Sequence, residues 1–258
     1  CHAWTPASLI EDEPVNAIEV GGITFYPSDL KALMITVYDY SHAVVIGGRC
    51  RAQKVERDDT GRILDPDCRD TNAGTFHVIM ANFLGRFGVG FAEDRTYTAE
   101  VWNQPVHAYS VDRLERIDLD KALSLLVAEP GNMTTYPFNA EAKGWAEVEV
   151  TLEYVTESHP SRDPVLPNFE SYLRTDRYHY VLELDGDDRI IGGEWINGSV
   201  TGPSGGFSGQ PDFLWYPTGP WPNPSPNGIH GAREPKKNPH VSYTKVLRLF
   251  EQSRLALP

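Results

Sequence analysis

The chain has 258 residues, of which 40% are hydrophobic and 11% aromatic, so it can form one large core or two small ones. Its formal net charge of −13 argues against nucleic acid as a partner, because phosphate binding needs clustered Lys and Arg. No apolar run approaches the roughly 18 residues of a transmembrane helix, and none is therefore predicted.

Two helices and two strand segments are predicted in the first fifty residues. Cys1–Glu13 has the pattern of a helix start, and Ile18–Phe25 is short and strand-like. Apolar residues then recur at helical spacing from Leu30, which predicts a helix that runs to about His42. A further strand begins at Val44–Ile46.

The middle of the chain is rich in strand signals. Thr75–Asn82 and Gly90–Gln104 are rich in β-forming residues and flank a glycine-rich turn, which predicts a hairpin. Trp145–Thr156 alternates apolar and charged residues, as a half-exposed strand does. Tyr178–Leu184 and Arg189–Trp195 flank the residues DGDD and predict a second hairpin.

Short helices are predicted at Leu119–Leu126 and Ser242–Leu255. Between the second hairpin and the last helix, Thr201–Pro239 is dense in Gly, Pro, Ser and Asn, which predicts a long surface loop packed down by its aromatic residues. The sequence contains no internal repeat and no clear linker. We therefore expect a single catalytic domain of the α+β class over residues 1–258, with an antiparallel sheet packed on helices.

The three cysteines allow at most one intrachain disulfide and leave one thiol over. Cys50 and Cys68 enclose a charged, turn-rich loop, and a bridge between them would stabilise the fold by roughly 3 kcal/mol in the loop-entropy model. Cys1 is then the free thiol. The alternative is three free cysteines in a cytosolic protein.

Cys1 is the candidate nucleophile. It heads an expected helix, and a helix N-terminus favours the thiolate, which is the reactive form of the side chain. A thiolate of this kind needs a histidine as general base. His77 is the best candidate because it lies inside the expected strand TFHVI, where a merely solvated histidine is unusual. The alternative is a structural histidine with no chemical role.

A third residue must orient the histidine, and Asp94 is the first candidate. In a simple antiparallel pairing of the two expected strands, Asp94 lies where the chain turns back past His77. Asp94 could equally form a salt bridge with Arg95 or Arg116. Asn103 is the second candidate for the orienting role.

Metal signals are weak. Asp185, Asp187 and Asp188 could bind calcium, but a hairpin turn uses the same residues without a metal. No metal-ligand spacing is found among His2, His159, His179, His230 and His240. The sequence also has no P-loop, no GxGxxG after a strand and no HExxH. The metal site is therefore unknown.

Several segments together resemble the oomycete-type transglutaminase elicitor family, which is also found in some bacteria. The most specific is VWNQPV at Val101–Val106, which is similar to the elicitor peptide of that family. The other segments that carry the resemblance are CxxW at Cys1–Trp4, CRDTNAGTFHV at Cys68–Val78, EDRTY at Glu93–Tyr97, IIGGEW at Ile190–Trp195 and PDFLW at Pro211–Trp215.

The resemblance implies a calcium-stimulated protein–glutamine γ-glutamyltransferase with a papain-like cysteine-enzyme fold. It also implies that the protein is secreted as the C-terminal product of a longer precursor, and an opening on Cys1 agrees with a processed chain. The implied partners are glutamine- and lysine-containing protein substrates. A host receptor that recognises the Val101–Val106 loop is a further implied partner.

In this mechanism Cys1 forms a thioester with a glutamine side chain, and His77 transfers the protons as a primary amine replaces it. Trp4, Trp102 and Asn103 are the expected substrate-binding residues, the two indoles walling the site. Two alternatives remain. One is a cysteine protease or amidase with the same residues and a different acceptor. The other is a recognition protein without enzymatic activity that presents the VWNQPV loop.

Overall fold

The computed structural model describes residues 1–39, 41–58, 60, 62–69, 71–196, 199, 206–220 and 241–255. By contacts the chain divides into two compact units, each built from several segments. Unit 1 comprises Cys1–Val44, Thr156–Leu173 and Tyr216–Pro258, and unit 2 comprises Val45–Val155 and Arg174–Trp215. The single catalytic domain expected from the sequence stays a prediction.

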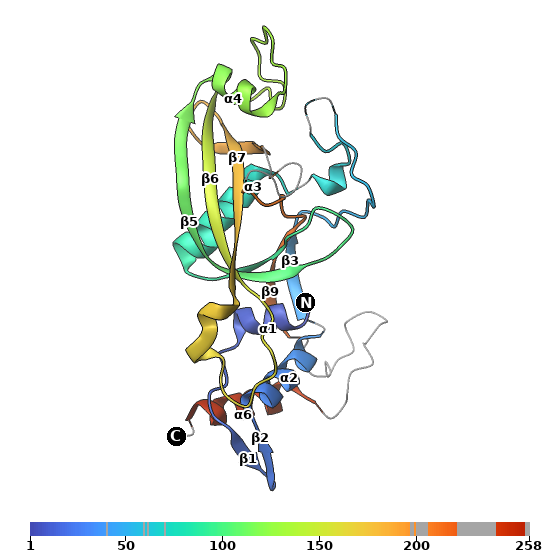
Figure 1. The fold of residues 1–258 in the computed structure, drawn as a ribbon, viewed down its shortest axis with the longest axis vertical. Coiled ribbons are helices and arrows are strands. Elements are labelled where there is room, and N and C mark those ends of the chain that lie inside the picture. The colour runs from blue at the N-terminus through green and yellow to red at the C-terminus, as the bar shows by residue number, and fades with distance from the viewer. Residues whose placement is uncertain are drawn as a thin grey trace. The chain divides into compact units, whose positions relative to one another are not determined.

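Unit 1 is mainly helical. Its elements are α1 (Trp4–Ile10), the hairpin β1 (Ile18–Val20) and β2 (Ile23–Phe25), α2 (Pro27–Tyr38), the 3₁₀ segment η3 (Leu166–Tyr172) and α6 (Tyr243–Leu255). Leu30, Met34 and Tyr38 follow each other at four-residue spacing on one face of α2, and all three are buried. They pack with Val246 and Phe250 of α6, which lies beside α2 in Figure 1.

A sheet of seven strands has the order β3-β9-β4-β5-β6-β7-β8. Its strands are β3 (Ser41–Ile46), β4 (Phe91–Asp94), β5 (Asn103–Ile117), β6 (Gly144–Val155), β7 (Leu173–Leu184), β8 (Ile190–Trp195) and β9 (Leu214–Pro220). Strands β4, β5, β6, β8 and nearly all of β7 belong to unit 2, whereas β3 up to Val44 and β9 from Tyr216 belong to unit 1. The short helix α4 (Leu119–Leu126) connects β5 to β6, and these two strands form a long antiparallel ribbon (Figure 1). The sheet and its helices confirm the α+β class, while the papain-like assignment stays a prediction.

The strand predictions for the long alternating segments are confirmed. In β6, Ala146, Val148, Val150, Leu152 and Tyr154 alternate toward the main core, which they share with the buried residues Tyr178, Tyr180 and Leu182 of β7. The predicted hairpin turn joins β7 to β8, with the Asp185 amide donating to the Arg189 carbonyl. The helices predicted at the positions of α4 and α6 are confirmed, and α2 is confirmed with its end at Tyr38.

The strand predicted at Thr75–Asn82 is wrong, because this segment begins with the helix α3 (Ala73–Met80) and continues into the π-helix η2 (Ala81–Phe87). The Asn72 side chain caps α3 by accepting a hydrogen bond from the Thr75 amide at 2.9 Å. Ala73, Phe76 and Met80 recur at helical spacing and are fully buried against the sheet. The packing of this helical face therefore outweighed the β-propensity of the residues in the segment.

Two glycines set how closely α3 approaches β8. A Cβ atom on Gly74 would lie 2.4 Å from the Gly192 carbonyl oxygen, and one on Gly193 would lie 2.7 Å from the Gly74 nitrogen. Any side chain at either position would force the two backbones apart. The helix that carries His77 therefore packs directly on the IIGGEW segment.

The prediction of a Gly/Pro-rich loop over Thr201–Pro239 is wrong in part. Residues Leu214–Pro220 form β9, which pairs antiparallel with β4 in the sheet. Residues 201–205 and 221–239 of the predicted loop lie outside the described residues. None of the helices in the described part of the chain combines the length and apolar character that crossing a bilayer requires.

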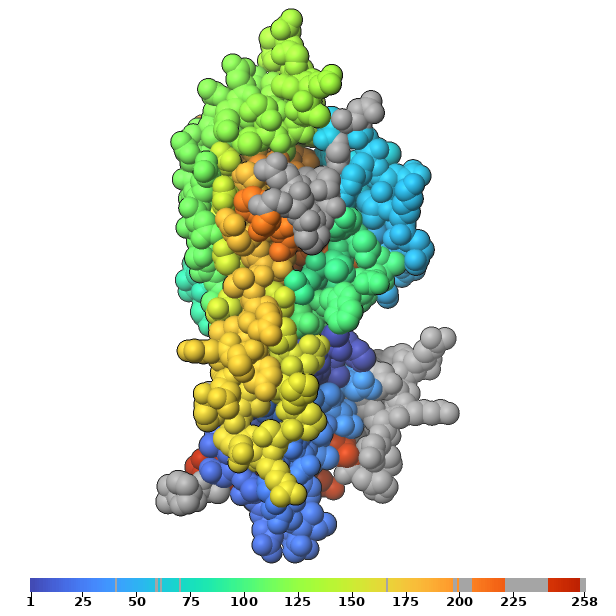
Figure 2. Space-filling view, in the orientation of Figure 1, coloured from blue at the N-terminus to red at the C-terminus, as the bar shows by residue number. Residues whose placement is uncertain are grey.

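The charged loop between Cys50 and Cys68 is packed against the rest of unit 2. Ile63 is buried with the two cysteines, Tyr97 packs against them, and the Arg57 guanidinium lies 5.4 Å from the centre of the Tyr97 ring. In the space-filling view, the light-blue loop adjoins the green segment around Tyr97 (Figure 2).

Candidate active site

Cys1 is an exposed free thiol in unit 1. Helix α1 begins at Trp4, with Ala3 as its N-cap, so the prediction that Cys1 heads the helix is wrong by three residues. Its Sγ atom is 3.8 Å from Oε1 of Glu157, and the same oxygen accepts a 3.1 Å hydrogen bond from the Trp4 indole. Glu157 thus holds the two predicted site residues of unit 1 together. No local sequence pattern marks it, because it is 156 positions from Cys1.

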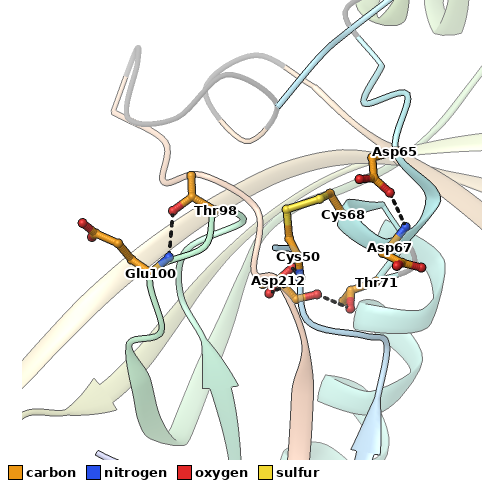
Figure 3. The surroundings of a disulfide bond; sticks show 8 residues. All are labelled: Cys50, Asp65, Asp67, Cys68, Thr71, Thr98, Glu100 and Asp212. Carbon is orange, nitrogen blue, oxygen red and sulfur yellow. Dashed lines mark hydrogen bonds between the residues drawn. A yellow bond between two sulfur atoms is a disulfide. The ribbon is translucent and has the colours of Figure 1, made fainter. Parts of the chain in front are cut away.

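The other two cysteines form the predicted disulfide, Cys50–Cys68. Figure 3 shows how it is anchored: the Cys50 amide donates to both carboxylate oxygens of Asp212, at 3.0 and 2.8 Å. The Thr71 hydroxyl donates to the Asp212 carbonyl at 2.7 Å. The bridge therefore ties the charged loop to the segment that leads into β9, and it leaves Cys1 as the chain's only thiol.

His77 lies on α3 in unit 2 and is half-buried. Burial lowers the pKa of its imidazole below the usual range, which keeps the ring neutral and able to accept a proton near pH 7. Nδ1 of His77 is 2.8 Å from the hydroxyl of Tyr180 on β7. Sequence reasoning missed Tyr180, although it predicted the strand Tyr178–Leu184 that contains it.

Asp94 ends β4 and is completely buried. Its Oδ1 accepts a hydrogen bond from the Trp102 amide at 2.7 Å. Its own amide donates to the Phe213 carbonyl, and its carbonyl accepts from the Asp212 amide, next to β9. Burial raises the pKa of its carboxyl to about 6. Oδ2 is buried without a hydrogen-bond partner among the described residues. The antiparallel pairing with the His77 segment does not occur, since β4 pairs with β5 and β9.

The VWNQPV segment is a loop only at its start. Trp102 is 49% exposed, whereas Asn103 through Val106 are buried and open β5. Asn103 pairs with Asp94 across the β4–β5 ladder, and its Oδ1 accepts a 2.8 Å hydrogen bond from the Trp215 indole. Asn103 thus joins the VWNQPV and PDFLW segments. The expectation of an exposed VWNQPV loop is wrong for these four residues.

The predicted site residues divide between the two units. Cys1 and Trp4 belong to unit 1, and His77, Asp94, Trp102 and Asn103 belong to unit 2. Hydrogen bonds and the β4–β5 ladder bring Asp94, Trp102 and Asn103 together. No hydrogen bond joins Asp94 to His77 in the described part of unit 2, where the imidazole is bonded to Tyr180.

The acidic turn at the end of β7 does not fit a calcium ion. Asp185 accepts hydrogen bonds from the amides of Asp187 and Arg189, as a turn residue does. Asp187 pairs with the Arg189 guanidinium, and Asp188 pairs with Arg116. With these carboxylates engaged by cations and amides, no calcium-dependent step can be derived from this turn.

One group of described residues has metal-like spacing that sequence reasoning missed. The ligand atoms of Glu147, Glu149 and His179 lie within 4.8 Å of one another. However, His179 is hydrogen-bonded to Glu147 at 2.8 Å, and Arg113 and Arg177 pair with the glutamates. A histidine and two arginines do not suit calcium, which prefers oxygen ligands. This group is an ion-pair network on neighbouring strands.

Together these features define an α+β protein on a large antiparallel sheet, with one free thiol and a half-buried histidine that is neutral near pH 7. The chain belongs to the transglutaminase elicitor family, whose model matches residues 1–254. Among solved structures it is similar to the GP42 transglutaminase from Phytophthora sojae, with 31% sequence identity and a TM-score of 0.72. The similarity covers 98% of this chain but 62% of that one. No curated protein matches the chain.

Proposed function

We propose that this protein is a protein–glutamine γ-glutamyltransferase that uses Cys1 as nucleophile and His77 as general base. The observation that carries the proposal is the free, exposed thiol of Cys1 in a chain of the transglutaminase elicitor family. The disulfide removes Cys50 and Cys68 as nucleophiles, which leaves Cys1 for covalent chemistry. The similarity to the GP42 transglutaminase supports the same reaction class.

The first half of the reaction forms a thioester. The Cys1 thiol passes its proton to His77 as the sulfur attacks the carboxamide carbon of a glutamine side chain. The carbon–nitrogen bond then breaks, and the imidazolium of His77 gives that proton to the leaving nitrogen, which departs as ammonia. The lowered pKa of His77 suits this role, because a neutral imidazole can accept the thiol proton.

The second half transfers the acyl group. A lysine or another primary amine attacks the thioester carbon, His77 accepts the proton that the amine loses, and the carbon–sulfur bond breaks. The thiolate that departs recovers the proton from His77, which restores both groups and leaves an isopeptide bond. The proposed partners are therefore proteins that present glutamine and lysine side chains. Calcium stimulation remains an expectation from the family alone.

Asp94 is the sequence-based candidate for the third catalytic role. Its burial and its unpartnered Oδ2 support a function beyond surface charge. Its Oδ1, however, is committed to the Trp102 amide. The structure therefore supports a role for Asp94 in holding the exposed Trp102, a proposed wall of the substrate site, while the contact to His77 comes from Tyr180.

We propose secretion as the cellular route, because a structural disulfide persists in oxidising compartments. Recognition by a host receptor is a second proposal of narrower scope. Of the Val101–Val106 segment only Trp102 is well exposed, so a receptor of the folded protein would bind Trp102 and its exposed neighbours.

The test is incorporation of a fluorescent primary amine into a glutamine-containing protein. We expect Cys1→Ala to abolish incorporation with an unchanged circular dichroism spectrum, and His77→Gln to reduce it by about 100-fold or more. Ser8→Ala, on the same helix α1, is the matched control and should retain activity. Retained activity in Cys1→Ala would end the proposal. Cys1-dependent hydrolysis without amine incorporation would instead show the protease or amidase alternative.

A further inference from the structure

The hydroxyl of Tyr180 is the group that the described structure places on the His77 imidazole, 2.8 Å from Nδ1. We infer that Tyr180 is the positioning residue of the proposed reaction: it accepts a hydrogen bond from Nδ1–H and so leaves Nε2 as the basic nitrogen that serves the Cys1 thiol. This inference rests on the proposed function. It assigns the orienting role to a phenol in place of the aspartate predicted from the sequence.

The first support is the count of ring nitrogens. An imidazole has two, and a neutral imidazole carries a proton on only one of them. A general base needs a free lone pair on the nitrogen that faces the nucleophile, so the proton must be on the other nitrogen and must have an acceptor there. With Tyr180 at Nδ1, the nitrogen left for the thiol is Nε2.

The second support is the rigidity of Tyr180. Its side chain is completely buried, and its ring packs edge-on against Phe76 and Trp195, with ring centres 5.9 and 5.4 Å away. Phe76 belongs to the same helix as His77, one residue before it. The close approach of Gly74 to Gly193 fixes that helix against β8. Both partners of the hydrogen bond are therefore held by packing, as a positioning contact requires.

The third support is electrostatic. Burial, together with nearby Tyr109 of β5, raises the pKa of Tyr180 well above its usual range, so Tyr180 remains a neutral phenol over the working pH range. A phenol oxygen can accept from Nδ1–H both in the neutral ring and in the imidazolium that forms during the reaction. Accepting in the charged state favours the imidazolium, which partly offsets the effect of burial on His77.

The opposite direction of the hydrogen bond between Tyr180 and His77 predicts a different result. If the phenol donated its proton to Nδ1, the ring proton would lie on Nε2 and the neutral imidazole would be stabilised. Loss of the hydroxyl would then raise the pKa of His77, whereas in our assignment it lowers that pKa further. The sign of the shift therefore separates the two arrangements without any measurement of activity.

The experiment compares Tyr180→Phe with Tyr178→Phe in the full chain. Tyr178 is the matched control, because it is a fully buried tyrosine of the same strand that also packs edge-on against Phe76 and Trp195, but its hydroxyl donates to Glu93 at 3.3 Å. Histidines labelled with ¹⁵N and ¹³C are titrated by NMR, and His77 is assigned from the spectrum of His77→Gln. Amine incorporation is measured in parallel.

We expect the wild-type His77 to carry its proton on Nδ1. In Tyr180→Phe its pKa should fall, its tautomers should mix, and kcat should drop by about 10-fold or more with KM unchanged. Tyr178→Phe should leave the tautomer and the pKa of His77 as in the wild type. A wild-type proton on Nε2, or a His77 pKa in Tyr180→Phe that is unchanged or raised, would overturn the assignment.

The two levels of the proposal can fail separately. The NMR readout needs no turnover, so it decides the Tyr180 contact even if the protein incorporates no amine. An active wild type with the wrong tautomer would overturn the role of Tyr180 and leave the γ-glutamyltransferase proposal standing. If Tyr180→Phe does not fold, the tautomer of His77 in the unmodified protein still decides the assignment.

Discussion

The indole of Trp215 donates a 2.8 Å hydrogen bond to the Asn103 side chain, and both residues are buried where β9 and β5 flank β4. This bond gives Asn103 a structural role. We expect Asn103→Ala and Trp215→Phe each to lower the free energy of unfolding by about 1–3 kcal/mol, because each removes this buried hydrogen bond. Urea unfolding of both variants measures this loss.

The double variant is the control for the Asn103–Trp215 bond. It should be more stable than the sum of the two single losses predicts, since the hydrogen bond between the two side chains can be lost only once. Strict additivity would show that the two side chains act independently. If Asn103→Ala keeps wild-type stability but raises KM, the original assignment of Asn103 to substrate binding is correct.

For Asp94 we expect Asp94→Asn to stay near wild-type kcat, because the asparagine oxygen can still accept the Trp102 amide. Asp94→Ala should lose about 1–3 kcal/mol of stability through the unpaired Trp102 segment. The measurements are urea unfolding and steady-state amine incorporation. A drop in kcat of about 100-fold in Asp94→Asn at unchanged stability would return the orienting role to Asp94.

Glu93 makes stability depend on pH. Burial first, and then the charge of Asp176, raise the pKa of this fully buried carboxyl from 4.5 to about 8. Between these values the folded state keeps a proton that the unfolded state releases, so stability falls as pH rises. One such proton changes the unfolding free energy by up to about 1.4 kcal/mol per pH unit.

We therefore expect Glu93→Gln to flatten the loss of stability between pH 5 and 8, as measured by urea unfolding in that range. Glu115→Gln is the control, since Glu115 is an exposed carboxylate on β5, and it should follow the wild-type curve. Parallel curves for Glu93→Gln and the wild type would show that Glu93 is ionised in the folded protein at all these pH values.

Ser253 joins the last helix of unit 1 to the loop before β1. Its buried hydroxyl accepts the amides of Val15 and Asn16, both at 3.0 Å, and donates to the Asn16 carbonyl at 2.6 Å. We expect Ser253→Ala to destabilise the protein by about 2–3 kcal/mol in thermal or urea unfolding. Ser124→Ala, in an exposed position on α4, should change stability by less than about 0.5 kcal/mol. Equal effects would contradict this role.

Removal of the disulfide should cost about 3 kcal/mol, because the 18-residue separation between Cys50 and Cys68 limits the unfolded chain. The double variant Cys50→Ser/Cys68→Ser, compared with the wild type in urea, measures the loss. Alkylation of the native protein without reductant should modify Cys1 alone. Modification of Cys50 or Cys68 under those conditions would contradict the bridge.

The local pattern of the chain was sufficient for the elements that have a single strong period. The alternation in Trp145–Thr156 specifies a strand with one buried face, and β6 has that form. The acidic turn after Leu184 specifies a hairpin, and the amphipathic pattern of Leu119–Leu126 specifies α4. These signals are local, because each element's buried face can be recognised without knowing its partner. The pairing of Cys50 with Cys68 was likewise predicted locally, from the charged, turn-rich loop that the two cysteines enclose.

Tertiary structure alone decided the surroundings of the candidate catalytic residues. The segment around His77 is short and β-rich, and it became a helix because Asn72 caps it and Phe76 finds a place in the core. The Tyr180 contact joins positions 103 residues apart, which no local period encodes. The burial of Asn103 likewise depends on Trp215 from a distant strand. Such contacts form only when separate elements pack, so the residue types present at a site are predictable from sequence while their partners are not.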